Sequence, residues 1–219
     1  MARKMPHMER DYTPADRLLM RLHQGLAQFS PSARSGRDNP ASAAPEPALD
    51  DAARRHAAGL MRINHAGEVA AQALYHGQAL TARTPQVREQ LLKAADEEQD
   101  HLQWCEQRLE ELGEGPSKLQ PFWYAGSFAI GAVAGLAGDK WSLGFVAETE
   151  KQVAEHLEDH LTQLPDSDER SRRILETMRA DETRHGNEAT QAGGLPLPRS
   201  VRALMQRAAR VMKFGAYRF

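Results

Sequence analysis

Apolar residues recur at helical spacing along most of the chain. From residue 50 onward the period stays close to 3.6 residues, and no stretch alternates strictly between apolar and polar positions, so the pattern predicts helices rather than strands. Residues that favour helix starts and stops divide the pattern into segments. The four long predicted helices are 50–83, 84–112, 139–164 and 167–192, with Asp139 as the expected N-cap of the third. The pattern therefore predicts an all-α domain built on a four-helix bundle.

Two further helices are predicted beside the bundle. The segment 122–138 has 17 residues without a charge and includes four glycines, which predicts an apolar helix. The segment 198–217 places basic residues on one face and apolar residues on another, which predicts an amphipathic C-terminal helix. We therefore expect the bundle to carry one additional apolar helix and one terminal amphipathic helix.

The N-terminal region differs from the rest of the chain. Apolar residues at helical spacing predict a short amphipathic helix at 12–29, within an N-terminal extension that spans 1–29. Between residues 30 and 47 the chain has four Pro, four Ser and four Ala but no Leu, Ile, Val, Met or aromatic residue. Such a composition buries too little apolar surface to order itself, so we expect 30–48 to be a disordered linker and 49–219 to be the working domain.

Charge and cysteine content exclude several classes of protein. Lys plus Arg number 28 and Asp plus Glu number 30, so the net charge of -2 offers no field for holding nucleic acid, which is not an expected partner. The single Cys105 cannot form an internal disulfide, and the first residues lack an apolar signal region. These features predict a reducing, cytoplasmic compartment.

Acidic residues interrupt the predicted core. The inward-facing stripe of 84–112 contains Glu98 and His101, that of 139–164 contains Glu150, and that of 167–192 contains Glu182 and His185. An ionised carboxylate buried without a partner is strongly destabilising, so several in one small core require a cation or a dense hydrogen-bond network. A bound metal provides this compensation most simply.

The spacing of these residues forms an internal repeat. Two Glu-x-x-His motifs, at 98–101 and 182–185, each follow a glutamate on the preceding helix, Glu68 by 30 residues and Glu150 by 32. Four carboxylates and two imidazoles of this kind are typical of ferritin-like dimetal carboxylate bundles. Four carboxylates balance two divalent cations, and oxygen-rich ligation favours iron, with manganese as the second candidate.

Each motif also offers alternative ligands. Glu97 and Asp181 lie four residues before the histidines of their motifs, on nearly the same face. The register of the stripe favours Glu98 and Glu182 as ligands, with Glu97 and Asp181 as hydrogen-bond partners of the ligand imidazoles. Only the repeat selects Glu68. Glu148 and Glu155 leave the inward stripe, so solvent exposure is the better interpretation of both.

The motifs together resemble those of a known family. They are Asn64-His65-Ala66-Gly67-Glu68, Glu98-Gln99-Asp100-His101, Glu148-Thr149-Glu150 and Asp181-Glu182-Thr183-Arg184-His185. The sequence resembles the demethoxyubiquinol hydroxylases of ubiquinone biosynthesis from about residue 50 to its end. The resemblance implies a di-iron monooxygenase that uses O2 to hydroxylate the ring of a polyprenylated methoxy-methyl-benzoquinol. The alternative is another ferritin-like dimetal protein, a manganese catalase or an iron store.

The resemblance also implies roles for individual residues. The implied metal ligands are Glu68, Glu98, His101, Glu150, Glu182 and His185. Glu98 and Glu182 would bridge two iron ions, whereas Glu68 and Glu150, whose own helices supply no imidazole, would each bind one. His156 corresponds to a family histidine close to the metals.

A polyprenyl substrate implies contact with a membrane. The segment 122–138 would extend about 26 Å as a helix, short of the roughly 30 Å hydrocarbon core of a bilayer. Half of the predicted ligands precede this segment and half follow it, so a single crossing would separate them. We therefore expect an interfacial helix in a peripheral protein at the cytoplasmic face of the cell membrane, with quinone-biosynthesis proteins as possible partners. Six basic residues and no acidic ones follow Glu188, which suits anionic lipid headgroups.

Overall fold

Helices make up most of the described chain, and its described residues contain no strand. The computed structural model describes residue 13, residues 36–46 and residues 48–219. The helices are α2 (Asp51–Thr81), α3 (Pro85–Glu111), α4 (Gln120–Leu136), α5 (Asp139–Gln163), α6 (Glu169–Gln191) and α7 (Arg199–Arg218). The prediction of an all-α fold is confirmed. The short helix expected at 12–29 falls, except for residue 13, outside the described residues.

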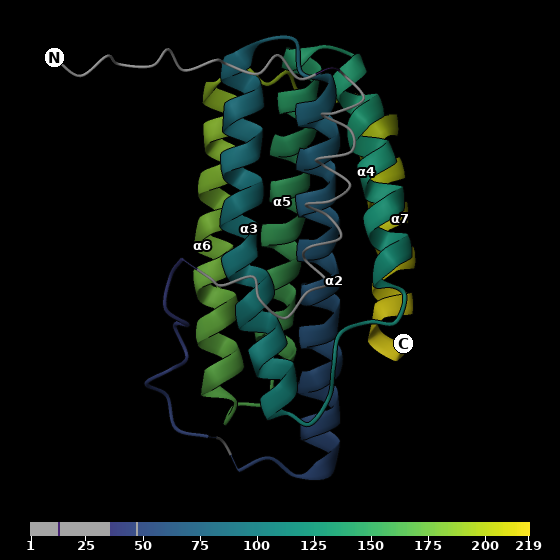
Figure 1. Ribbon diagram of the computed structural model, residues 1–219. Coiled ribbons are helices and arrows are strands. Elements are labelled where there is room, and N and C mark those ends of the chain that lie inside the picture. The colour runs from purple at the N-terminus through teal and green to yellow at the C-terminus, as the bar shows by residue number, and fades with distance from the viewer. Residues whose placement is uncertain (1–12, 14–35, 47) are drawn as a thin grey trace, which may run out of the picture. The chain divides into compact units, whose positions relative to one another are not determined.

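Four long helices form the bundle that the pattern predicts. α2 pairs with α3, α5 pairs with α6, and the two pairs meet where α2 contacts α5 and α3 contacts α6. Figure 1 shows these four helices side by side, with α4 and α7 along one side of them. Both additional helices pack against α2. Each helix pair therefore presents one half of the sequence repeat to the centre of the bundle.

Helix starts follow the sequence signals with one correction. The Asp50 side chain accepts a hydrogen bond from the backbone N–H of Ala53 at 2.8 Å, and Thr84 caps α3 just before Pro85. Asp139 was expected to cap α5, but Gly138 occupies that position. The Asp139 carboxylate instead accepts hydrogen bonds from the backbone N–H and the hydroxyl of Thr84. It therefore stabilises the start of α3, because the fold brings the two helix starts together.

Two apolar layers fill the bundle on either side of its centre. One layer includes Met61, Trp104, Leu157, Ile174 and Met178. The other includes Tyr75, Leu91, Leu143 and Val146. The acidic positions of the stripes fall between these layers, so hydrocarbon separates them from solvent along the bundle axis.

Glycines allow α4 to approach α2 closely. A Cβ atom added at Gly131 would lie 2.2 Å from the carbonyl oxygen of Leu74, and one added at Gly77 would lie 2.2 Å from that of Phe128. The backbones touch at these points, which no larger residue permits without displacing a helix. The opposite face of α4 exposes large apolar side chains, including 72% of Phe122 and 68% of Val133. None of the described helices is both long and apolar enough to span a membrane.

Residues 36–46, which we call the N-terminal strap, lie against α3 and α6. This segment belongs to the stretch that we expected to be a disordered linker. Arg37 pairs with Asp100 and Glu46 pairs with Arg108, while Ala41 is buried in the apolar layer around Trp104. The expectation of disorder fails for these residues because ion pairs and a small buried side chain anchor them. The expectation rested on composition alone, which shows only that large apolar residues are lacking.

Candidate metal centre

The six predicted ligands converge at the centre of the bundle. Glu68 comes from α2, Glu98 and His101 from α3, Glu150 from α5, and Glu182 and His185 from α6. All six are buried, with at most 5% of any residue exposed. They form two groups, within each of which one potential ligand atom per residue lies within 4.8 Å of the others. The groups are Glu68, Glu98, His101 and Glu182, and Glu98, Glu150, Glu182 and His185.

Two carboxylates are common to both groups and face both histidines. Oε2 of Glu98 lies 2.9 Å from Nδ1 of His101, and its Oε1 lies 3.4 Å from Nδ1 of His185. Oε1 of Glu182 lies 3.0 Å from Nδ1 of His101, and its Oε2 lies 3.6 Å from Nδ1 of His185. Each carboxylate thus directs one oxygen toward each imidazole.

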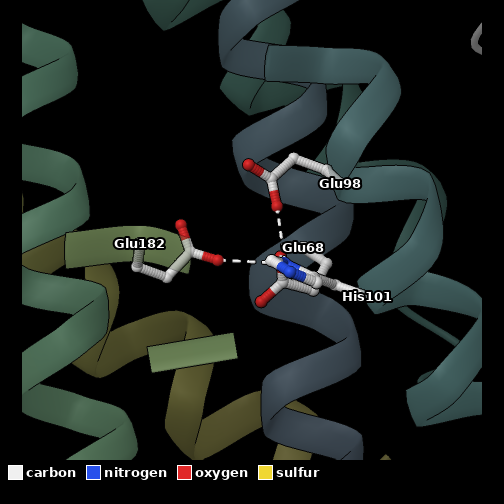
Figure 2. Close-up of side chains that lie close together, drawn as sticks. All are labelled: Glu68, Glu98, His101 and Glu182. Carbon is white, nitrogen blue, oxygen red and sulfur yellow. Dashed lines mark hydrogen bonds and ion pairs between the residues drawn. The ribbon is translucent and has the colours of Figure 1, made fainter. Parts of the chain in front are cut away.

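The other two carboxylates each belong to one group. Oε2 of Glu68 lies 3.4 Å from Nδ1 of His101, and Figure 2 shows Glu68, Glu98 and Glu182 surrounding this imidazole. Glu150 belongs only to the His185 group. Both of its carboxylate oxygens are buried and have no hydrogen-bond partner in the part of the chain that the structure describes. A buried carboxylate in this condition indicates that a ligand completes its surroundings.

Burial and mutual repulsion perturb the acids of this centre. Burial, together with the charges of Glu182 and Glu98, raises the pKa of Glu68 well above its usual value. Burial and the charge of Glu182 likewise raise the pKa of Glu150. Although burial opposes ionisation of Glu98, hydrogen bonds from His101 and His185 lower its pKa. Without cations, protons on Glu68 and Glu150 therefore relieve part of the negative charge.

The imidazoles are held from outside the cluster by a second pair of acids. Nε2 of His101 lies 3.0 Å from Oδ2 of Asp181, and Nε2 of His185 lies 2.8 Å from Oε2 of Glu97. Although partial burial opposes ionisation, hydrogen bonds from His185 and Arg184 lower the pKa of Glu97 to about 2. An ionised carboxylate only accepts hydrogen bonds, so each Nε2 donates and each Nδ1 faces the cluster. Without cations the Nδ1 atoms carry protons because, although burial opposes protonation, the surrounding carboxylates raise the pKa of His101 well above its usual value and that of His185 to about 12. A bound cation would take the place of these Nδ1 protons.

His156 lies in a different environment. It is not a member of either group, and its ring centroid lies 3.8 Å from that of His160. Burial, together with the charges of His160 and Lys213, lowers the pKa of His156 to about 2. His156 is therefore a neutral imidazole that packs against His160, the other histidine on α5.

The donor set suits a pair of divalent metal ions. Each group offers three carboxylates and one imidazole, all deprotonated or readily deprotonated when a cation displaces their protons. Oxygen-rich sites with one imidazole per ion suit iron and manganese better than copper, and the described residues contain no cysteine pair for an iron–sulfur cluster. The orphaned oxygens of Glu150 and the shared carboxylates fit a site for two ions.

Sequence patterns missed two sets of charged residues in the bundle. Arg37 donates to Asp100 at 2.6 Å and to Asp181 at 2.8 Å. Arg108 is fully buried and donates to Asp168 at 2.9 Å. The sequence contained one indication of the Arg37 contacts: the residue before the histidine of the motif is Asp100 in one repeat and Arg184 in the other.

Comparison with known proteins decides the family. A family model described as ubiquinone biosynthesis protein COQ7 matches residues 55–215, a range that includes all six clustered residues. The chain belongs to the COQ7 family. The motif resemblance is therefore confirmed.

Relatives of this COQ7 family member match it over nearly their whole lengths. A protein of Cupriavidus metallidurans is 60% identical over 205 residues, which cover 93% of this chain and 99% of the relative. A protein of Ralstonia pickettii is 56% identical over 214 residues, and one of Xanthomonas oryzae pv. oryzae is 54% identical over 207. All three relatives are named 3-demethoxyubiquinol 3-hydroxylase. Their similarity covers more of the chain than the range matched by the family model.

Proposed function

We propose that this protein is a di-iron monooxygenase that hydroxylates the ring of a polyprenylated demethoxyubiquinol in ubiquinone biosynthesis. The observation that carries the proposal is the convergence of four glutamates and two histidines into two groups that share Glu98 and Glu182. Family membership and the names of the relatives support the reaction and its substrate. Iron is the proposed metal because its change between two oxidation states suits O2 chemistry. The alternative functions, manganese catalase and iron storage, do not include hydroxylation of a quinol.

The proposed ligands are the six clustered residues. Glu98 and Glu182 would bridge the two ions, because each carboxylate faces both imidazoles. Glu68 and Glu150 would each hold one ion, in keeping with their membership of one group each. Asp181 and Glu97 would keep Nδ1 of each imidazole directed at the ions. His156 remains a proposed neighbour of the metal centre, as the resemblance implies, and is not a proposed ligand because it belongs to neither group.

When bound, an iron pair supplies the capacity to reduce and activate O2, so that one oxygen atom enters the ring and the other leaves as water, with an electron pair from a reductant. The chain's own contribution is to exclude water and to manage protons. The two apolar layers close the centre along the bundle axis. The raised pKa values of Glu68 and Glu150 mean that these carboxyls release protons as metal binds.

An oxygen-isotope assay tests the proposed reaction. Purified protein loaded with iron and chemically reduced is mixed with a short-chain demethoxyquinol and labelled O2, and the product is measured by mass spectrometry. We expect a quinol whose ring carries one oxygen atom from the labelled gas. Disproportionation of hydrogen peroxide by the manganese-loaded protein, without hydroxylation by the iron-loaded protein, would instead favour the catalase alternative.

We further propose that α4 and α7 hold the protein at a membrane surface. Exposed apolar side chains gather on both helices: Phe122, Ile130, Val133 and Leu136 on α4, and Leu204, Val211 and Phe214 on α7. α7 adds the basic residues that would contact anionic headgroups. A substrate with a polyprenyl tail requires such contact with the bilayer.

Vesicle binding tests this membrane contact. Replacing both Phe122 and Val133 with serine is expected to weaken binding to vesicles of mixed neutral and anionic phospholipid about tenfold or more, because two large apolar side chains no longer enter the bilayer. Co-sedimentation measures the bound fraction. Leu195→Ser, at a less exposed position between α6 and α7, is the matched control and should bind like the wild type. Equal binding by all three proteins would contradict the proposed surface.

A further inference from the structure

The N-terminal strap bridges the two halves of the bundle at both of its ends. At one end, Arg37 donates to Asp100 on α3 and to Asp181 on α6, at 2.6 and 2.8 Å. At the other end, the Glu46 carboxylate accepts from Arg108 on α3 and from Arg170 on α6, at 3.2 and 2.7 Å. The charges are opposite at the two ends, so the strap can dock in one direction only.

Contacts between these ends keep the strap in place. The side-chain amide of Asn39 donates to Oε1 of Gln107 on α3 at 2.8 Å. Ala41 is 2% exposed and packs within the apolar layer that contains Trp104. The guanidinium of Arg37 lies 4.8 Å from the centroid of the Trp104 ring, whose own neighbour is the His101 ring at 5.4 Å. Arg37 is thus held against the residues that surround His101.

The two repeats differ in how they hold the carboxylate behind each histidine. In the His185 half, Nη2 of Arg184 donates to Glu97 at 2.8 Å, and Glu97 accepts from His185. Arg184 is the residue directly before His185. The residue directly before His101 is Asp100, which cannot donate in this way when it is ionised.

Arg37 occupies the corresponding role in the His101 half. Asp100 accepts from Nε of Arg37 and from the backbone N–H of Gly36, at 2.6 and 2.7 Å. This pairing directs Nη1 of Arg37 to Oδ2 of Asp181, the same oxygen that lies 3.0 Å from Nε2 of His101. An arginine, a carboxylate and an imidazole therefore follow one another in both halves, but in this half the arginine comes from the strap.

We propose that Arg37 is a positioning residue of the metal centre, and that the strap supplies to the His101 half the arginine that α6 supplies to the His185 half. Arg37 acts through Asp181, which fixes the orientation of His101, and Nη2 of Arg37 itself lies 3.4 Å from Nε2 of His101. The contribution of Arg37 to holding Asp181 is limited, because the Arg37 side chain is 40% exposed and Arg184 also contacts Asp181, at 3.2 Å. This inference rests on the proposed metal centre.

Iron release tests the inference without relying on activity. Wild-type, Arg37→Ala and Arg37→Lys proteins are loaded with ferrous iron under anaerobic conditions, and release to a coloured ferrous chelator is followed by absorbance. In Arg37→Ala we expect the iron beside His101 to be released about 3- to 10-fold faster than in the wild type. This effect is smaller than that of losing a carboxylate bonded directly to a ligand imidazole. Arg37→Lys keeps the charge but loses the forked geometry of the guanidinium, so its rate of iron release should lie between those of the wild type and Arg37→Ala.

Two control variants separate positioning from general anchoring. Glu46→Ala releases the opposite end of the strap and touches neither Asp181 nor His101. Arg62→Ala removes another partly buried arginine, which pairs with Glu114 outside the six-residue cluster. Both controls should release iron at the wild-type rate, and thermal unfolding of the metal-free proteins records any loss of stability.

The outcomes distinguish this inference from the proposed function. Wild-type release kinetics in Arg37→Ala, or equal acceleration in Glu46→Ala and Arg37→Ala, would overturn the positioning role while leaving the metal centre in place. A wild-type protein that takes up no iron would overturn both. Faster release in Arg37→Ala alone, partly restored by Arg37→Lys, would support the inference.

Discussion

Glu182→Gln is expected to reduce the iron content of the purified protein to about a tenth or less of the wild-type value and to abolish hydroxylation. Glu182 belongs to both ligand groups, so its loss removes a donor from both ions at once. The amide has the size of the carboxylate but no charge, and a neutral oxygen is a much poorer ligand for a divalent ion. Metal per chain, measured by elemental analysis, checks the result.

Variants of the other glutamates make this prediction sharper. Glu68→Gln removes a donor from one group only, so it should lose mainly one of the two metal ions. Glu155→Gln changes an exposed glutamate on the helix that also carries Glu150, and it should retain the wild-type iron content. The metal-free Glu182→Gln protein should be less stable than metal-free wild type because, although burial opposes ionisation of Glu182, hydrogen bonds from His101 and His185 lower its pKa, and the amide loses this pairing. Full iron content in Glu182→Gln would exclude a bridging role.

Arg108→Met is expected to destabilise the metal-free protein by about 3–5 kcal/mol, the usual effect of breaking a buried ion pair by removing one partner. Arg108 and Asp168 are both fully buried, and the pair also includes a hydrogen bond from Arg108 to the Ser171 hydroxyl at 3.0 Å. Methionine fills much of the same space but leaves the Asp168 carboxylate without its cation. Chemical denaturation followed by circular dichroism measures the free energy of unfolding.

A matched arginine and a double variant identify the cause. Arg170 pairs with Glu46 and Glu111, as Arg108 does, but not with Asp168, so Arg170→Met should cost about 1 kcal/mol or less. Adding Asp168→Asn to Arg108→Met should recover part of the lost stability. Asparagine carries no charge and can still accept the hydrogen bond from the Ser171 backbone N–H that caps α6. No recovery would show that the unpaired carboxylate is not the source of the loss.

Local signals in the sequence predicted the helices because the start and end of a helix depend mainly on residues close together along the chain. The Thr84-Pro85 pair marks the start of α3, and the glycines at 193 and 194 follow the end of α6, as their capping preferences predict. Asp139 shows where this approach fails. Its sequence context favours a cap for α5, but the tertiary fold brings it to the residues just before α3, where its carboxylate accepts hydrogen bonds from the backbone N–H groups of Arg83 and Thr84 and from the Thr84 hydroxyl.

The strap marks a second limit. Its composition predicts disorder because it lacks large apolar residues, and that argument considers the segment alone. Arg37, Asn39 and Glu46 find partners on α3 and α6 that are 60 or more residues away along the chain. Long-range ion pairs of this kind have no periodicity and leave no local pattern, so sequence reasoning overlooked them.

From local patterns alone, the sequence predicted a helical chain and six core-facing candidate ligands, because a helix repeats every 3.6 residues, both Glu-x-x-His motifs keep the register of the apolar stripes, and the internal repeat selects Glu68. The arrangement of these groups depends on how the helices pack: Glu98 and Glu182 each face both imidazoles, and Arg37 reaches Asp181 from outside the bundle. Spacing along one helix sets which face a residue occupies. Distances between side chains on different helices depend on how the helices pack, which no single segment of the chain encodes.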